Sequence, residues 1–159
     1  MEDSVVTHLD SRAGYAEQFA AVIARSRRSL QLFDPDAAIF PLGNSDIDAL
    51  LRHFLAGGGT LQVALHSAAH VERHYPRFMR LAQDFGHLVA VRLTPRSLHL
   101  LTDSFCIGDG VHIVRRYHCD HLRGEAVFDA PLSTEISLER FGAIWSESLP
   151  GLATSTTGL

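Results

Sequence analysis

Residues 45–65 restrict the fold more than any other part of the sequence. Apolar residues recur there at helical spacing up to Gly57-Gly58-Gly59, where the glycines end the helix. Thr60–Leu65 then has the composition of a strand, and an alternating strand pattern precedes the helix at Ser29–Phe33. Strand, helix, glycine stop and strand in this order form a crossover unit, which joins parallel strands. We therefore expect a sheet that is at least partly parallel.

Further helical patterns occur on both sides of this unit. A first helix is expected after a cap at Asp10 or Ser11. Ser45 and Asp48 have the spacing of a capping box at the start of the second helix. A later helix is expected to begin at Pro76, because proline is tolerated in a first helical turn and not inside a helix. The last helix has five apolar residues on its predicted inner face: Ile136, Leu138, Phe141, Ile144 and Trp145.

Strand patterns complete the predicted sheet. They lie at Val5–Leu9, Leu88–Leu93, Ile113–Arg116 and Glu125–Asp129. A tight hairpin is also expected between Leu98–Thr102 and Phe105–Gly108, with its turn at Asp103-Ser104. Together these patterns predict an α/β fold, with a mixed, partly parallel sheet flanked by helices on both faces.

The length and the ends of the chain indicate a single domain. A chain of 159 residues fits one domain with one core. We assign residues 1–150 to this domain and expect residues 151–159, rich in small and hydroxyl side chains, to form a disordered tail. No apolar run approaches the ~18 residues of a membrane span, and the acidic start MEDSVV lacks the features of a targeting signal. We therefore expect a soluble cytoplasmic protein.

The charged residues narrow the classes of function. A net charge of −4 argues against non-specific nucleic-acid binding, which needs a surplus of basic side chains. The chain has no lysine, so all 14 basic residues counted as lysine or arginine are arginines. Any mechanism that uses a lysine as a Schiff base or a general base is therefore excluded.

The order of elements and two local stretches resemble one half of the phospholipase D superfamily. The segment ALLRHFLAGGGTLQV at 49–63 looks like that family's helix leading into a "GVxV" strand. Phe141 and Trp145, on one face of the last helix, are similar to residues of the family's closing helix. The likeness spans residues 15–148 and implies the fold class given above.

The signature of that family, HxKxxxxD followed by a strand of small residues, is degenerate in this sequence. If Asp103 is the motif aspartate, Arg96 stands at the histidine position and Leu98 at the lysine position. In the family a histidine attacks phosphorus, a second histidine protonates the leaving group, and lysines hold the phosphate oxygens. Arginine is too basic for the first two roles but can bind a phosphate group.

A second register places the motif histidine at His99. The lysine position is then Leu101 and the aspartate position is Cys106, so the motif is lost in this register too. The resemblance therefore implies a module without the family's cleavage chemistry, which binds a phosphate-bearing ligand or a protein partner, with two copies pairing as a homodimer.

The predicted ligand site lies in the second half of the chain. It comprises Arg96, His99, Asp103, Arg115, Arg116 and Arg123. The alternative for these arginines is pairing with the carboxylates of Asp120, Glu125 and Asp129. Two other functions stay open: a structural or regulatory interaction domain without a ligand site, and a phosphodiesterase or nuclease rebuilt around His99, Asp103 and the arginines.

No cofactor and no metal ion are expected. The run His118-Cys119-Asp120-His121 concentrates metal-binding residue types, but adjacent ligands rarely converge on one ion, so we interpret it as a polar loop. His70 and His74 are four residues apart and are interpreted as surface residues, because Pro76 interrupts the helical pattern. Cys106 lies in an apolar strand and is expected to serve packing.

Overall fold

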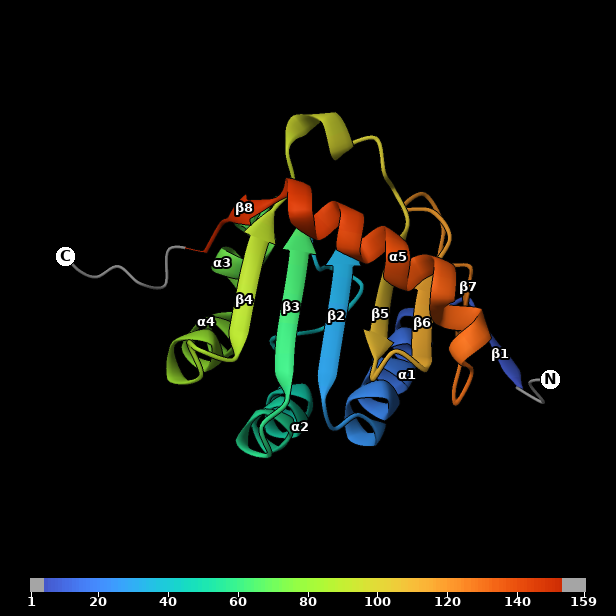
Figure 1. The fold of residues 1–159 in the computed structure, drawn as a ribbon, viewed down its shortest axis with the longest axis horizontal. Helices are drawn as coiled ribbons and strands as arrows, with labels where there is room; N and C mark the ends of the chain where they lie inside the picture. Colours follow the sequence, from blue (N-terminus) through green and yellow to red (C-terminus); the bar gives the residue numbers. More distant parts are fainter. Residues whose placement is uncertain (1–4, 153–159) are drawn as a thin grey trace.

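The computed structural model describes residues 5–152 and contains an eight-stranded sheet with helices on both faces (Figure 1). The strands are β1 (Val6–Leu9), β2 (Ser29–Asp34), β3 (Thr60–Leu65), β4 (Val89–Leu93), β5 (Ser104–Gly108), β6 (His112–Arg116), β7 (Gly124–Val127) and β8 (Leu149–Pro150). The helices are α1 (Arg12–Arg25), α2 (Ser45–Ala56), α3 (Ala69–His74), α4 (Pro76–Asp84) and α5 (Pro131–Glu147), with a 3₁₀ turn, η1, at Arg96–Leu98.

The sheet has the strand order β1-β7-β6-β5-β2-β3-β4-β8. β2, β3 and β4 are parallel, and α2 connects the first two, as the glycine stop predicted. The pairs that involve β1, β5, β6, β7 and β8 are antiparallel. The predicted mixed, partly parallel sheet is therefore confirmed.

Two apolar cores cover the two faces of this sheet. Side chains alternate along each strand, so that Leu32 and Cys106 pack with α1, α2 and α4, whereas Phe33 and Phe105 pack with α5. In Figure 1, α5 crosses the front of the sheet and the other helices lie behind it. Helices on both faces leave the ends of the strands as the exposed margins of the sheet.

The two predicted helix caps have different outcomes. The Ser11 Oγ atom accepts a hydrogen bond from Gly14 N and caps α1, as predicted. The capping box at Ser45 is wrong, because Ser45 is already helical and Asn44 takes the cap position without a side-chain hydrogen bond. The Asp48 carboxylate instead accepts a hydrogen bond from Arg52, one turn further along the helix.

The predicted hairpin at 98–108 is also wrong. Residues 96–98 form the 3₁₀ turn η1, and β5 pairs with β2 and β6. Ser104 is not in a turn but is the first, fully buried residue of β5. The hairpin turn follows β5, where Asp109 (φ 53°) and Gly110 (φ 71°) have the left-handed conformation that Asp-Gly tolerates.

Several smaller features differ from the sequence prediction. Pro76 begins α4 as expected, but a separate short helix, α3, comes directly before it. The strand β8 was not predicted, and it pairs with the edge of β4. Ile136 was assigned to the core, yet it is 73% exposed because it lies on the outer side of α5. Within residues 5–152, no helix has the length and apolar character of a membrane span.

The division into a domain at 1–150 and a tail at 151–159 stays a prediction. Most of the proposed tail, residues 153–159, lies outside the described residues. The described Gly151 continues the chain from β8, and its N–H donates a hydrogen bond to the Val91 carbonyl.

Candidate functional site

Several polar residues lie together at one edge of the sheet. The parallel strands β2, β3 and β4 end at this edge, with Asp34, His66 and Thr94 at or directly after their carboxyl ends. The antiparallel neighbours contribute Ser104, at the start of β5, and Arg116, at the end of β6. Ligand sites of open α/β sheets lie outside the carboxyl ends of the parallel strands, so this edge is the candidate site.

A cleft of about 450 Å³ opens beside this edge, between α5 and the loop that follows η1. Its lining residues are Leu100, Leu101, Thr102, Asp103, Phe105, Arg115, Arg116, Tyr117, Ser137 and Arg140. The cleft thus brings together Asp103, Arg115 and Arg116 from the predicted ligand site. Arg140, which the sequence analysis did not select, lines the same cleft.

The guanidinium group of Arg140 pairs with Asp103 through two hydrogen bonds. They measure 2.7 Å from Nη1 to Oδ2 and 3.0 Å from Nη2 to Oδ1. This pairing raises the pKa of Arg140 further above its ordinary value. Arg140 comes from α5 and Asp103 precedes β5, so the pair fastens the helix to the loop beside the cleft.

Arg115 and Arg116 are neighbours on β6 with different kinds of partner. Arg115 forms an ion pair with Glu125 at 3.1 Å and donates to the Ser133 carbonyl at 2.6 Å. For this residue, the alternative that the arginines pair with nearby carboxylates is therefore correct. Arg116 donates to the carbonyls of His121 (2.6 Å) and Cys119 (2.9 Å). No carboxylate of residues 5–152 lies within ion-pair distance of the Arg116 guanidinium, but its positive charge acts on Asp34 at longer range and opposes the rise of the Asp34 pKa.

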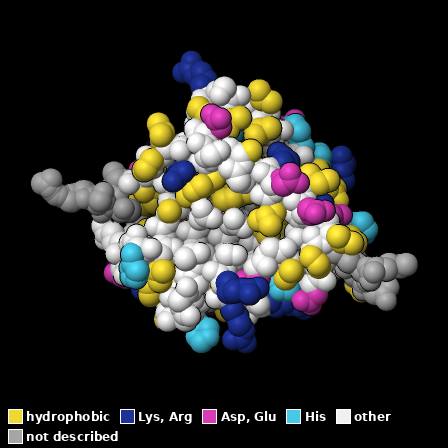
Figure 2. All heavy atoms as spheres, in the orientation of Figure 1, with side chains coloured by type: hydrophobic (Ala, Val, Ile, Leu, Met, Phe, Trp, Pro, Cys, Tyr) yellow, Lys and Arg dark blue, Asp and Glu magenta, His cyan; other side chains and the backbone are white. Residues whose placement is uncertain are grey.

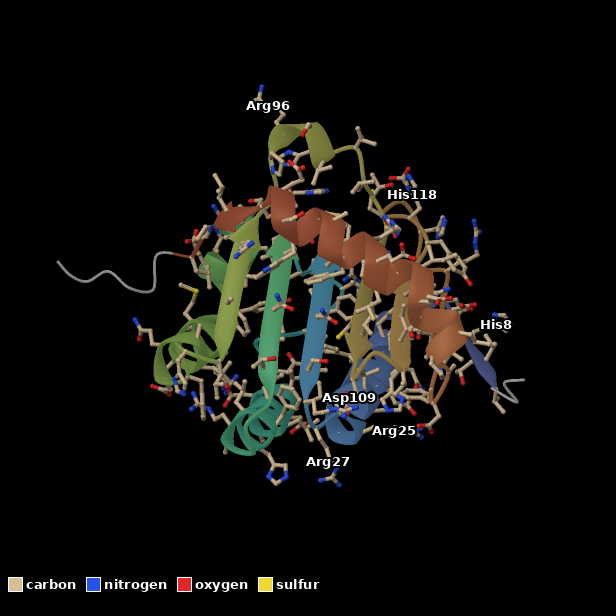
Figure 3. All side chains as sticks on the ribbon, viewed as in Figure 1. His8, Arg25, Arg27, Arg96, Asp109 and His118 are labelled. Atoms are coloured by element: carbon tan, nitrogen blue, oxygen red, sulfur yellow. The ribbon has the colours of Figure 1, made fainter. Side chains whose placement is uncertain are left out.

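The other three predicted site residues do not line this cleft. Arg96 is exposed on η1 and points away from the sheet (Figure 3). Arg123 lies beside β1, in a separate hollow of about 300 Å³ with His8 and Asp10. His99 packs its ring 4.6 Å from the ring of His66, between centroids. The six predicted residues therefore form no single pocket. Arg96 and His99 lie on the turn η1 and the loop after it, and Arg123 lies on the loop after β6.

Asp34 is the most deeply buried carboxyl group at this edge, and the sequence analysis did not select it. It is 1% exposed, and its Oδ1 atom accepts a hydrogen bond from the Ser104 hydroxyl. Its Oδ2 atom is buried and has no hydrogen-bond partner. Burial raises the pKa of Asp34 to about 7, although the Ser104 hydroxyl, the Ala37 backbone N–H and the positive charge of Arg116 act in the opposite direction. A carboxyl group of this kind gains and loses its proton near neutral pH.

His66 fastens the loop that borders the cleft. Its Nε2 atom lies 2.7 Å from the Leu101 carbonyl, so it carries the proton and donates. Its Nδ1 atom then accepts from the Thr94 hydroxyl at 2.6 Å. Burial lowers the pKa of His66, in agreement with a neutral ring. The rule that sites follow the carboxyl ends of parallel strands could have selected Asp34, His66 and Thr94 from the sequence.

Three further sequence interpretations concern cysteines and histidines. His118, Cys119 and Asp120 have donor atoms within 4.8 Å of one another in an exposed turn. Of these, the His118 Nδ1 atom already accepts a hydrogen bond from Asp120 N. Cys106 is buried in β5, and burial raises the pKa of its thiol. The rings of His70 and His74 lie 4.7 Å apart, between centroids, and are tilted by 50° on α3, which ends before Pro76.

Comparisons with known proteins place the fold. Two chains of similar length match over 94% of this chain. They are Nuc, a phospholipase D family member from Salmonella typhimurium (TM-score 0.68, 15% identity, 99% of that chain), and NucT from Helicobacter pylori (TM-score 0.62, 8% identity, 100% of that chain). The phosphatidylserine synthase of Haemophilus influenzae matches with a TM-score of 0.63 and 10% identity, over 93% of this chain and 40% of its own. The fold is therefore phospholipase D-like.

A second kind of protein shares this fold. TrmBL2, an archaeal chromatin protein whose structure shows a novel mode of DNA binding, matches with a TM-score of 0.68 and 10% identity, over 95% of this chain and 55% of its own. No curated protein matches the sequence. The model of the family described as a domain of unknown function, DUF7931, matches residues 11–153, and the protein belongs to that family.

Proposed function

We propose that this domain is a non-catalytic phospholipase D-like module that binds a phosphate-bearing ligand in the cleft beside α5. The observation that carries the proposal is that Arg116, which lines this cleft, has no ion-pair partner among the described residues. Two backbone carbonyls hold its guanidinium at the sheet edge, and neither of them neutralises the charge. A fixed guanidinium loses little side-chain entropy when an anion binds and offers planar donors to phosphate oxygens.

A third alignment of the HxKxxxxD motif also lacks the family's catalytic groups, and this supports a binding role. If Asp109 is the motif aspartate, HxKxxxxD places Thr102 at the histidine position and Ser104 at the lysine position. Asp109 follows β5 and precedes β6, as an aspartate between two strands of a hairpin should. Neither a threonine nor a serine can form a phosphohistidine or hold a phosphate through an ammonium group. Each of the three registers therefore lacks the histidine and lysine pair.

The alternative of a rebuilt phosphodiesterase has less support from the contacts. It requires His99, Asp103 and the arginines to act on one substrate. His99 instead packs against His66, and Asp103 is engaged by Arg140. The nearest polar contact of the His99 Nε2 atom is the Thr94 carbonyl, at 3.4 Å, on the loop that carries His99.

Titration with dimethyl phosphate, followed by ¹H–¹⁵N spectra of the arginine side chains and the backbone, tests the proposal. The wild-type protein should show saturable shifts at Arg116 and at other cleft residues. Arg116→Gln should weaken binding at least tenfold, which is about 1.4 kcal/mol. Arg116→Lys keeps the charge and should retain part of the affinity, which separates the loss of charge from a rearranged loop.

The matched control is Arg80→Gln, which removes an exposed arginine charge on α4, away from the cleft. Its affinity for dimethyl phosphate should equal that of the wild type. Equal binding by the wild type and a folded Arg116→Gln variant would contradict the proposal. So would the absence of saturable shifts in the wild type.

A further inference from the structure

The loop between β6 and β7 brings three different kinds of metal-binding side chain together at its tip. The tip is a turn in which His121 N donates a hydrogen bond to the His118 carbonyl at 3.4 Å. One donor atom from each of His118, Cys119 and Asp120 lies within 4.8 Å of the other two. Consecutive side chains of an extended strand point to opposite faces, so the turn is what allows these three neighbours to converge.

The distances between these atoms suit a shared metal ion. The His118 Nδ1 atom lies 3.5 Å from Asp120 Oδ2, and the Cys119 Sγ atom lies 3.8 Å from Asp120 Oδ1. Zn²⁺ binds nitrogen and oxygen at about 2.0–2.2 Å and sulfur at about 2.3 Å, so neighbouring ligands of a tetrahedral ion lie about 3.3–3.8 Å apart. Small side-chain rotations therefore suffice to bring all three groups onto one ion.

Each of the three groups has a lone pair to offer. The His118 Nδ1 atom accepts a hydrogen bond from Asp120 N at 3.0 Å, so this nitrogen is unprotonated and its lone pair points into the turn. An ion that binds there displaces the amide, which water then reaches because the turn is exposed. Cys119 is exposed, and a thiol releases its proton when it binds a metal ion.

The charge and the rigidity of the turn both favour a doubly charged ion. The Cys119 thiolate and the Asp120 carboxylate together carry two negative charges, which balance such an ion within its own ligand set. The nearby Arg116 guanidinium then faces a site without net charge. Arg116 also donates to the carbonyls of Cys119 and His121, which fixes the backbone of the turn and lowers the entropic cost of binding.

From this geometry we propose that His118, Cys119 and Asp120 form a binding site for a divalent transition-metal ion of the Zn²⁺ type. Nitrogen and sulfur ligands select Zn²⁺ or Co²⁺, whereas Mg²⁺ and Ca²⁺ bind oxygen ligands. His121 is not one of the ligands, because its Nδ1 atom accepts a hydrogen bond from Arg123 N at 3.1 Å within the loop. The fourth position of the ion is therefore open to water.

The proposed metal site lies next to the cleft but is separate from it. Arg116 and Tyr117, directly before the turn, line the cleft. In Figure 3, His118 lies at the same end of the sheet as Arg96, and Figure 2 shows histidine, arginine and acidic side chains gathered on this part of the surface. A bound ion would fasten the loop that borders the cleft, whatever the cleft itself binds.

Titration of the full chain with Co²⁺, in the presence of a non-thiol reductant, tests the site. Co²⁺ bound to a thiolate gives a charge-transfer band in the near ultraviolet, and Cys106, the other cysteine, is buried. The wild type should show a saturable band with one ion per chain. Excess Zn²⁺ should abolish this band, whereas excess Mg²⁺ should not. Cys119→Ser should remove the band.

Two further variants test the other ligands while they keep the thiol. Loss of an outer-shell partner already costs roughly 10–100-fold in metal affinity, so His118→Ala and Asp120→Ala should each weaken Co²⁺ binding at least about tenfold. Their side chains are 43% and 83% exposed, so both variants should fold. His74→Gln is the matched control, because it disrupts the close histidine pair on α3 and should leave the band unchanged.

The absence of a saturable band in the wild type would overturn the proposal. A band of equal affinity in the wild type, His118→Ala and Asp120→Ala would overturn it too, because the thiolate alone would then hold the ion. Weaker binding in both of these variants, with unchanged binding in His74→Gln, supports the site.

Discussion

Two aspartates lie at opposite ends of the β2–β5 strand pair, and the protein holds them in contrasting ways. Asp109 follows β5 at the amino end of β2, where its carboxylate accepts hydrogen bonds from the backbone N–H groups of Arg27, Arg28 and Ser29 at 2.8–3.2 Å. Asp34 ends β2 at the other edge, where Ser104 is its hydrogen-bond donor. In Figure 3, Asp109 lies near Arg27 at one end of the sheet, and the loop with Arg96 lies at the other.

The pKa values of these two groups shift in opposite directions. Burial alone would raise the pKa of Asp109, but the three backbone N–H groups outweigh it and lower the pKa below its ordinary value. Burial dominates at Asp34 and raises its pKa to about 7. The amino edge therefore uses its carboxylate for stability. At the edge with the candidate site, the buried Asp34 carboxyl group has one oxygen without a hydrogen-bond partner. Functional sites often keep such groups at a cost in stability.

The largest expected effect is the response of Asp34→Asn to pH. Because the pKa of Asp34 is higher in the folded state than in the unfolded state, its protonated form stabilises the protein at low pH. That stability should be lost as the pH rises from about 4 through 7, by an amount on the order of 2–4 kcal/mol. Asparagine has a similar shape and does not ionise. The variant should therefore be more stable than the wild type at pH 8 and similar to it at pH 4.

Urea unfolding of the two proteins at a series of pH values measures this difference. Subtracting the two curves removes the titration of all other groups. Asp10→Asn, at an exposed aspartate that is not among the groups acting on the pKa of Asp34, is the control and should change the curve little. A constant difference between Asp34→Asn and the wild type from pH 4 to pH 8 would mean that folding does not raise the pKa of Asp34, and the contrast with Asp109 would be lost.

The next largest effect is expected for Asp109→Ala, which removes the acceptor of three backbone N–H groups. We expect a loss of about 2–3 kcal/mol in the free energy of unfolding at pH 7. Part of it arises because alanine is strained at the positive φ of this position. Asp109→Asn tolerates that φ and keeps one acceptor oxygen, so it should lose less.

The pH dependence of Asp109 should be the reverse of that of Asp34. A lowered folded-state pKa contributes stability above the unfolded-state pKa of about 4, and this contribution is lost as the pH falls through the folded-state value. The wild type and Asp109→Asn should therefore converge in stability towards pH 2–3. A difference that persists undiminished at that pH would mean that the charge of Asp109 is not what holds the turn.

Much of the fold followed from local patterns in the sequence. The glycine stop at 57–59 and the strand after it predicted the parallel β2–β3 pair, because each part of that crossover has its own local signal. The hairpin failed where two local signals competed. Asp103-Ser104 and Asp109-Gly110 both suit a turn, and burial of Ser104 against Asp34, a contact across 70 residues, favours the second.

The candidate site was less predictable, because it depends on contacts between distant segments. Asp103, Arg115 and Arg116 were selected and do meet at one cleft. Arg140 was missed, since only the packing of α5 across the sheet brings it to Asp103, 37 residues away. Asp34 and His66 could have been found from their positions after parallel strands, but the partners that perturb their pKa values come from other segments.

The smallest effect is expected for Ser104→Ala, which sharpens the contrast between the two aspartates. The hydroxyl favours the charged form of Asp34, so its removal should raise the pKa of Asp34 above 7. The loss of stability with rising pH should then continue to higher pH and become larger by about 1 kcal/mol. Ser97→Ala, at an exposed serine of η1, is the matched control. Urea unfolding at a series of pH values measures this effect. An unchanged pH profile in Ser104→Ala would mean that the hydroxyl does not stabilise the ionised Asp34 carboxylate.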